Sequence, residues 1–145
     1  MVEIHVERTI AAPQQQVFDW MADPANLTTA PLALKSGWVK GTSEPGIGAS
    51  RWLLGAGMWI GDEELTAFDR PNRYAYRIVR AFPPFDHEGG AVTLTPSGTG
   101  THVDWISTYT HPAYAGGRGL EAVTSRLLRS GFIAILAGCA TALER

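Results

Sequence analysis

The chain has 145 residues, of which 45% are hydrophobic and 18% charged, and this is enough for one globular domain, residues 1–145, with a core of its own. Its formal net charge of -2 lacks the basic excess that nucleic-acid-binding domains usually carry, so no nucleic-acid partner is expected. The single cysteine, Cys139, excludes an internal disulfide and fits a cytoplasmic location.

The N-terminal segment is predicted to be a strand followed by a short helix. The first ten residues alternate in polarity, which predicts a strand whose apolar side is formed by Val2, Ile4, Val6 and Ile10. This pattern contains no long apolar run, so we expect neither a signal peptide nor a membrane span there. In AAPQQQVFDWMADP, Pro13 suits the first turn of a helix, and Val17 and Met21 form an apolar stripe. Asp23-Pro24 ends this helix, because the residue before a proline avoids the helical region.

The middle of the chain, from about residue 33 to 111, is predicted to be a β-meander. Short runs rich in Trp, Tyr, Val, Ile and Thr alternate there with turn signals such as DRPN and PSGTG. The runs predict six strands, at about 34–41, 48–54, 58–68, 73–81, 87–95 and 101–110. Because the connections between them are short, the strands are expected to pair antiparallel.

After Pro112 the pattern becomes helical and stays so to the C-terminus. Gly116-Gly117 opens the helix, and beyond Gly131 its polar face almost disappears. Three explanations remain open: the sheet covers this half more fully, the helix bends at Gly131, or a partner covers it. The order of elements predicts an α+β fold in which a curved seven-stranded antiparallel sheet wraps around the long C-terminal helix. The space between sheet and helix is the expected binding site.

Three segments resemble a known family. VEIHVERTIAAPQQQVFDWMADPANL at the start, EELTAFDRPNRYAYRI in the middle, and the PSGTGT hairpin before the last strand are similar to the START-related (SRPBCC) helix-grip superfamily, in particular its polyketide cyclase/dehydrase-like branch. The resemblance covers essentially the whole chain and implies a helix-grip fold. It does not select one function, because the superfamily includes aromatase/cyclases, lipid and hormone binders, quinone-binding proteins and co-chaperone domains.

The segment THVDWISTYTH, residues 101–111, has the residue types of a catalytic site but not the required geometry. Alternation along the strand places Ser107 on the opposite face from His102 and Asp104, so a Ser-His-Asp triad is excluded. Ser107 shares the more apolar face with Trp105 and Tyr109, and this face is expected to point at the helix. For Trp105, a pocket wall and plain core packing remain equally open, whereas the hydroxyl of Tyr109 favours the wall.

The predicted ligand-binding residues are mostly aromatic, which suits a flat, ring-bearing or lipid-like molecule. They are Trp52, Trp59, Tyr74, Tyr76, Arg80, Trp105, Ser107 and Tyr109. Arg80 is expected at the rim, where its guanidinium would meet an anionic or enolate oxygen; the alternative is a surface arginine. For each single aromatic the alternative is core packing.

No catalytic residue is assigned, and the remaining polar candidates are weaker. Arg51 is expected to face solvent if Trp52 faces inward. In the acidic run 62–64 one carboxyl must point inward if the strand is regular, and an apolar cavity would raise its pKa. His87 is expected on a loop over the cavity mouth, as a gate, a proton carrier or merely an exposed side chain. No metal and no cofactor are expected, because the histidines match no metal-ligand spacing and no phosphate-binding loop follows a strand.

These observations lead to three functional hypotheses. The first is a polyketide cyclase/dehydrase whose cavity folds a reactive poly-carbonyl chain and works mainly by orientation. The second is a non-catalytic binder or carrier of a lipid, quinone or similar metabolite. The third is a protein-interaction module that uses Ile133 and Leu136 on the last helix. The expected partner is a small hydrophobic ligand, and a homodimer is left open.

Overall fold

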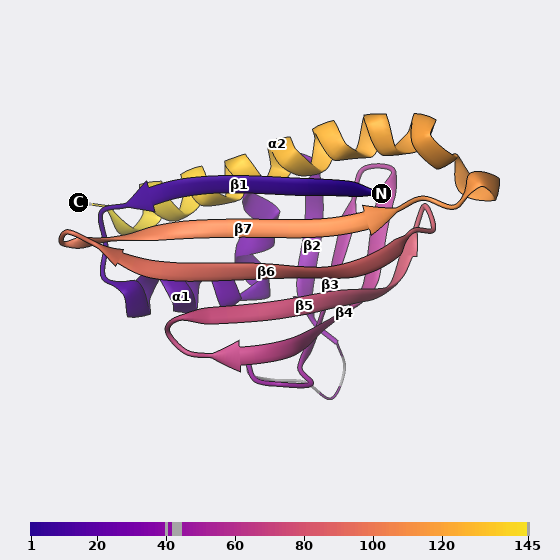
Figure 1. Ribbon diagram of the computed structural model, residues 1–145. Helices are drawn as coiled ribbons and strands as arrows, with labels where there is room; N and C mark the ends of the chain where they lie inside the picture. Colours follow the sequence, from indigo (N-terminus) through magenta and orange to yellow (C-terminus); the bar gives the residue numbers. More distant parts are fainter. Residues whose placement is uncertain (40, 42–44, 145) are drawn as a thin grey trace.

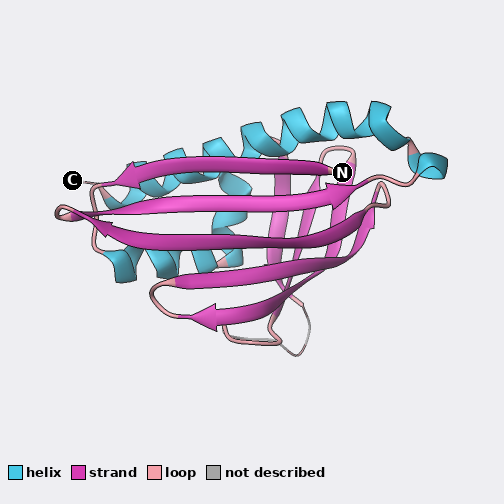
Figure 2. Cartoon of the chain, viewed as in Figure 1, coloured by secondary structure: helices cyan, strands magenta, loops and turns pink. Residues whose placement is uncertain are grey.

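The computed structural model describes residues 1–39, 41 and 45–144. Its strands form one antiparallel sheet in the order β1-β7-β6-β5-β4-β3-β2 (Figures 1 and 2). The strands are β1 (Val2–Ile10), β2 (Ala33–Trp38), β3 (Ser50–Gly55), β4 (Met58–Asp69), β5 (Arg73–Phe82), β6 (Asp86–Ser97) and β7 (Gly100–Thr110). The helices are α1 (Gln14–Ala22) and α2 (Gly117–Leu143), with two 3-10 turns, η1 (Pro24–Thr29) and η2 (Ala113–Ala115). The predicted helix-grip fold is confirmed.

The sheet is a meander from β2 to β7, and β1 joins it at the far edge beside β7. All six predicted meander strands are present, with ends shifted by a few residues. The predicted strand at 34–41 ends earlier, at Trp38, and its Lys40 lies outside the described residues. The N-terminal strand therefore closes one edge of the sheet against the last strand of the chain.

Irregular pairing curls the sheet around α2. Register shifts interrupt the β3–β4 pairing between Arg51 and Leu53, and the β4–β5 pairing on both sides of Asp62. Such bulges bend a strand and increase its twist. As a result β2 and β3 cross behind the long strands β1, β7 and β6, and the sheet has a concave side (Figure 1).

The hydrophobic core lies between this concave side, α1 and the second half of α2. The apolar residues of β1 predicted to share one side, such as Ile4, Val6 and Ile10, are buried at 4% exposure or less. They meet Val17 and Phe18 of α1 within one cluster. Alternation in β1 and the helical stripe of α1 are thus both explained by one common core.

The two halves of α2 are buried to different extents. Ile135, Leu136, Cys139 and Ala140 in the second half are buried, and Thr29 of η1 lies close beside Gly138. The helix is continuous through Gly131, so it does not break there. The fold covers most of the half whose polar face disappears, although Ile133 stays 47% exposed. In the first half, Glu121 and Thr124 are buried whereas Val123 and Leu127 are more than half exposed.

By length and composition alone, α2 is also apolar enough to cross a membrane. This is a property that core helices share with membrane spans. The second half of α2 is packed in the fold as just described. The expectation that the chain has no membrane span stays a prediction.

Candidate functional site

A group of polar side chains lies on the inner wall of the sheet, facing α2. Tyr76 comes from β5, His87 from β6, and Trp105 and Ser107 from β7, and each is at most 4% exposed. The three strands are neighbours, with Tyr76 opposite Gly90 and Gly90 opposite Ser107. The ring of Tyr76 lies over Gly90, where a Cβ atom would stand 2.2 Å from the tyrosine Cζ. We call Tyr76, His87, Trp105 and Ser107 the inner-wall quartet.

Hydrogen bonds hold the quartet in place. The indole Nε1 of Trp105 donates to the hydroxyl of Tyr76 at 2.8 Å. The backbone N–H of Ile78 donates to Nδ1 of His87 at 2.9 Å, and Nε2 of His87 lies 2.8 Å from Oγ of Ser107. The imidazole also stacks on the ring of Tyr76, with 5.5 Å between ring centroids. Each of the four side chains therefore has a fixed orientation.

The tautomer of His87 follows from these contacts. A backbone N–H can only donate, so Nδ1 is the unprotonated nitrogen and Nε2 carries the hydrogen. His87 consequently donates to Ser107 and does not accept its proton. This is the reverse of the arrangement that activates a serine nucleophile. The hydroxyl oxygens of Ser107 and Tyr76 each accept a hydrogen bond within the quartet, so their hydroxyl hydrogens are available to a bound molecule.

The quartet is neutral at physiological pH. Burial lowers the pKa of His87 to about 4, and the nearby charge of Arg77 adds to this effect. Burial also raises the pKa of Tyr76 above its usual range. A neutral imidazole and a protonated phenol suit the binding of a carbonyl or hydroxyl oxygen better than the binding of a charged group.

A second chain of hydrogen bonds joins the sheet to the first half of α2. Nδ1 of His111 lies 2.9 Å from the carbonyl oxygen of Pro84, which can only accept, so in the neutral ring Nε2 is the acceptor. Thr124 then donates to Nε2 of His111 at 2.9 Å and accepts from the hydroxyl of Tyr109 at 2.9 Å. Glu121 accepts from the backbone N–H of His111 at 2.9 Å.

The interior beside this second chain is almost closed. A void of about 10 Å³ is lined by Met58, Pro83, Phe85, Tyr109, His111, Thr124 and Leu128, and this is about the room of one water molecule. Further along the wall, the rings of Trp105 and Phe132 stack with centroids 3.9 Å apart. The expected space between sheet and helix is therefore filled at these places by the protein's own side chains.

Arg51 is buried, and the expectation that it faces solvent is wrong. It is 2% exposed and forms a hydrogen-bonded ion pair with Glu63, the member of the acidic run that points inward. Burial lowers the pKa of Arg51, but the Glu63 carboxylate, with smaller contributions from Tyr74 and Tyr76, outweighs this effect, and the pKa is raised overall. Trp52 consequently turns to the other face, where its indole lies over Gly37. It does not line the interior as predicted.

Tyr74 lies beside this ion pair. The guanidinium carbon of Arg51 is 5.6 Å from the centroid of the Tyr74 ring, and the Tyr74 hydroxyl donates to the carbonyl of Met21 at 3.1 Å. Burial raises the pKa of Tyr74 to about 12. Tyr74 is thus a core residue whose hydroxyl is used for packing α1 against the sheet.

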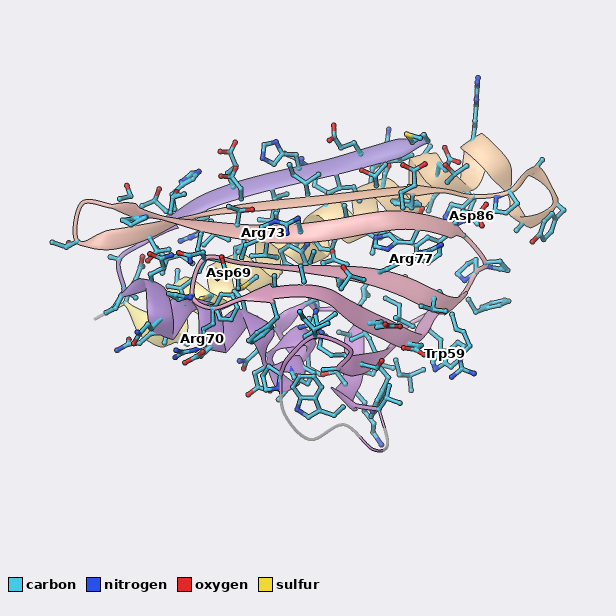
Figure 3. All side chains as sticks on the ribbon, turned by 60° about the horizontal axis from the view of Figure 1, so that its bottom comes forward. Trp59, Asp69, Arg70, Arg73, Arg77 and Asp86 are labelled. Carbon is cyan, nitrogen blue, oxygen red and sulfur yellow. The ribbon has the colours of Figure 1, made fainter. Side chains whose placement is uncertain are left out.

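Two further predicted binding residues lie at the exposed end of β4 and β5. Trp59, labelled in Figure 3, is partly exposed, and the guanidinium carbon of Arg80 is 5.6 Å from its ring centroid. The prediction that they line the cavity or its rim is wrong, because the irregular pairing around Asp62 interrupts the alternation on which it rests. The prediction of a loop position for His87 is also wrong, since this residue lies within β6 and is buried.

A wider groove lies elsewhere, between α1 and the strands β2 and β4. Its volume is about 430 Å³, and it is lined by Asp19, Asp23, Trp38, Pro45, Phe68 and Arg70. Arg70 donates through two nitrogens to the two carboxylate oxygens of Asp19, both at 2.7 Å, and this hydrogen bonding lowers the pKa of Asp19. Sequence reasoning missed this groove, because its residues come from separate segments and share no spacing.

A curled antiparallel sheet gripping a C-terminal helix, with polar side chains held on the inner wall, defines a helix-grip protein of the START-related superfamily. Residues 1–144 match the family described as polyketide cyclase/dehydrase and lipid transport. The chain belongs to this family.

Solved structures agree with this fold. The chain is similar to TTHA0849 from Thermus thermophilus, with 21% identity, a TM-score of 0.75, and coverage of 97% of this chain and 95% of the other. It is similar to major latex-like protein 151 from Panax ginseng, with 15% identity, a TM-score of 0.67, and coverage of 94% and 96%. It is also similar to the Aha1 dimer from Colwellia psychrerythraea, with 15% identity, a TM-score of 0.68, and coverage of 99% and 97%. No functionally curated protein shows significant similarity to the chain.

Proposed function

We propose that the protein binds a small, largely apolar, ring-bearing molecule with at least one oxygen acceptor, and that it does so between the inner wall of the sheet and α2. The observation that carries this proposal is the inner-wall quartet. Its hydrogen-bonding groups come from three adjacent strands and converge among aromatic rings. A purely structural core has little use for four such groups, because burying each of them requires a partner.

Entry of a ligand requires the first half of α2 to move, because the interior is nearly filled. This half is held mainly by Glu121 and Thr124, whereas Val123 and Leu127 contribute little buried area. Its attachment therefore depends on few apolar contacts, in contrast to the second half. The movement exposes Tyr109 and the Trp105–Phe132 stack to an incoming ring.

Two functions remain for such a site, an enzyme and a non-catalytic carrier. The converging polar groups favour the enzyme. In a polyketide cyclase/dehydrase, hydroxyl donors from Tyr76 and Ser107 would stabilise an enolate oxygen while the cavity holds the carbon chain in a folded conformation. The tautomer of His87 excludes a direct role for it as base toward Ser107. A carrier would need only the apolar surfaces.

We also propose a cytoplasmic location, which the free, buried Cys139 suits.

Binding is tested with three probe classes, a flavonoid, a sterol and a long-chain fatty acid, by thermal shift and by native mass spectrometry. We expect a saturable rise in melting temperature for the flavonoid. Ser107→Ala and Tyr76→Phe should weaken binding about tenfold each, since each removes one hydrogen bond. Thr108→Ala is the matched control, because Thr108 lies one residue away on the opposite face of β7. The absence of any shift with all three classes, or an equal loss with Thr108→Ala, would contradict the proposal.

Catalysis is tested separately with a linear poly-β-ketone. The cyclase/dehydrase hypothesis predicts loss of water from this compound, detected by mass, at a rate that falls in Tyr76→Phe and Ser107→Ala. Recovery of the unchanged compound from a protein that binds it would identify a carrier instead.

A second candidate function is self-association through α2. It is favoured by the row of apolar side chains that α2 leaves exposed, namely Val123, Leu127 and Ile133 at 47% or more. Leu136, predicted in the same surface, is 1% exposed and cannot contribute. We propose a homodimer that buries this row, as the dimeric state of one structural neighbour suggests. Leu127→Asp should convert the dimer to a monomer in size-exclusion chromatography. Arg118→Asp, at an exposed position on the opposite side of α2 from Leu127, should not. A monomeric wild type would rule the homodimer out.

A further inference from the structure

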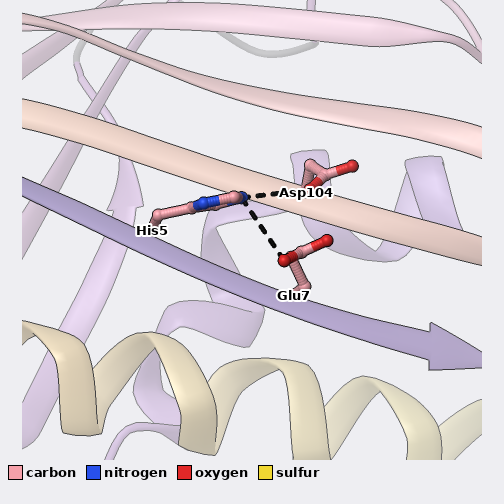
Figure 4. A group of neighbouring side chains, drawn as sticks. All are labelled: His5, Glu7 and Asp104. Atoms are coloured by element: carbon pink, nitrogen blue, oxygen red, sulfur yellow. Dashed lines mark hydrogen bonds and ion pairs between the residues drawn. The ribbon is translucent and has the colours of Figure 1, made fainter.

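A group of histidines and carboxylates lies on the outer face of the sheet, away from α2. His5 and Glu7 belong to β1, and His102 and Asp104 belong to β7. Glu7 stands directly opposite Asp104 in the register, and residues two apart share a face of the sheet. The four side chains therefore project from the same small area, as Figure 4 shows for three of them. None of them takes part in the inner-wall quartet or in the groove.

Three of these side chains have ligand atoms at the separations that a metal ion requires. Nε2 of His5 lies 3.1 Å from Oδ1 of Asp104 and 3.8 Å from Oε2 of Glu7, and the three ligand atoms all lie within 4.8 Å of one another. In a tetrahedral zinc site with bonds of about 2.0–2.1 Å, ligand atoms stand about 3.4 Å apart. The two His5 distances bracket this value. Small rotations of exposed side chains would complete the geometry.

His102 holds the two carboxylates from the other side. Its Nε2 lies 3.0 Å from Oε1 of Glu7 and 3.7 Å from Oδ2 of Asp104, the oxygens that His5 does not approach. Its Nδ1 lies 3.0 Å from the hydroxyl of Thr9. His102 is therefore placed to orient both carboxylates, as the outer hydrogen-bond partners of metal ligands do.

The donor set identifies the class of ion. Imidazole nitrogen with carboxylate oxygen suits zinc and neighbouring transition metals, whereas magnesium and calcium prefer oxygen alone. Two carboxylates also supply the negative charge that a dication requires. We infer that His5, Glu7 and Asp104 form a zinc-binding site that bridges β1 and β7, with His102 as its positioning residue. Three protein ligands leave a fourth position for water.

Zinc in this site would have a structural consequence, because β1 is the edge strand of the sheet. A metal that joins His5 and Glu7 to Asp104 links the N-terminal edge strand to its neighbour. Since the ion binds the folded chain, it raises the stability of the fold by mass action. The absence of a metal-ligand motif in the sequence does not conflict with the site, because its ligands meet only through strand pairing.

The experiment is a titration of the full chain with zinc at pH 7.5, followed by calorimetry and by melting temperature. Cobalt substitution gives a visible absorption spectrum that reports a tetrahedral site. We expect one equivalent to bind, with a rise in melting temperature, and we expect magnesium to have no effect. His5→Gln and Asp104→Asn should each weaken zinc binding at least 100-fold, and His102→Gln about tenfold to 100-fold.

The control variant is Glu64→Gln, which removes one exposed carboxylate from β4, a strand remote from the proposed site. It should leave zinc binding unchanged. The substituted positions are exposed or partly exposed, so the variants should fold, which circular dichroism checks. The proposal is overturned if wild type binds no zinc at 100-fold excess over protein, or if His5→Gln and Asp104→Asn bind it as wild type does. An equal loss of zinc affinity in Glu64→Gln would mean that binding depends only on the net charge of the chain, and that result would also overturn the proposal.

Discussion

Arg51 and Glu63 form an ion pair inside the molecule, between the neighbouring strands β3 and β4. Both side chains are almost fully buried, and Arg51 also lies 3.4 and 3.5 Å from the carbonyl oxygens of Met21 and Ala22. Among the described residues, its Nε has no hydrogen-bond partner. A buried charge of this kind is tolerated only while its counterion is present.

Removal of one partner of this pair should therefore be costly. Glu63→Gln leaves the charge of Arg51 uncompensated, and the free energy of unfolding should fall by about 3–5 kcal/mol. Glu64→Gln, its exposed neighbour, should change it by less than about 0.5 kcal/mol. Urea denaturation measures both. The double variant Arg51→Met/Glu63→Leu should be more stable than Glu63→Gln, because it leaves no buried charge without a counterion. If the double variant is less stable than Glu63→Gln, the cost does not come from an uncompensated charge on Arg51.

The pH dependence of stability should contain a component from His87. Burial, with a smaller effect of Arg77, lowers its pKa from 6.5 to about 4 in the folded protein. The unfolded chain therefore takes up a proton near pH 6.5 that the folded chain accepts only near pH 4. The stabilisation is fully present above pH 6.5 and is lost as the pH falls toward 4.

This component is measured as a difference between two proteins. Urea denaturation of wild type and His87→Gln from pH 7.5 to 4 should give a shallower decline for the variant, whatever its absolute stability. NMR titration of the His87 ring gives the pKa directly. Parallel declines in the two proteins would contradict the assignment of this component to His87.

Two glycines should respond in opposite ways to substitution by alanine. At Gly90 the new methyl group would overlap the buried ring of Tyr76, and displacement of that ring should cost about 1–3 kcal/mol. At Gly119 no atom stands within 4 Å of an added Cβ, and α2 should gain up to about 1 kcal/mol. Thermal unfolding compares them, and a stabilised Gly90→Ala would show that Tyr76 is free to move.

The stack of Trp105 and Phe132 should control the space available to a ligand. Phe132→Ala removes one of two rings whose centroids are 3.9 Å apart, and it should lower stability by about 2–4 kcal/mol because it leaves a cavity. The same variant should bind an apolar fluorescent probe more tightly than wild type. Ile133→Ala, at a 47% exposed neighbour, is the control. If probe binding is unchanged in Phe132→Ala, the interior is not the binding site.

The fold could be predicted because its signals are local and repeated. Alternation in residues 101–110 predicts Trp105, Ser107 and Tyr109 inside and His102 and Asp104 outside, and the structure agrees because β7 pairs regularly with β1 along this stretch. For Arg51 and Trp52 the alternation holds, but the wrong residue of the two was expected to face inward. The same reasoning fails for Trp59 and Arg80. Trp59 and Arg80 lie where the pairing of β4 with β5 shifts register around Asp62, and a bulge reverses the face of every residue beyond it.

The candidate sites were less predictable, because they depend on contacts between distant segments. His87 and Ser107 are 20 residues apart and meet only because β6 pairs with β7. The groove of Asp19 and Arg70 joins α1 to a turn 51 residues later. One usable signal was present, since the strand predicted at 87–95 already includes His87.

The unequal burial of α2 also bears on how the molecule opens. The second half of α2 has buried apolar side chains packed on the core. In the first half, the leucine and valine side chains at positions 127 and 123 are mostly exposed to solvent. Local opening is cheapest where buried apolar area is smallest. Deuterium should therefore enter the amides near Val123 long before those near Cys139. The helix would then act as a hinged cover, fixed at its C-terminal end and released from the other.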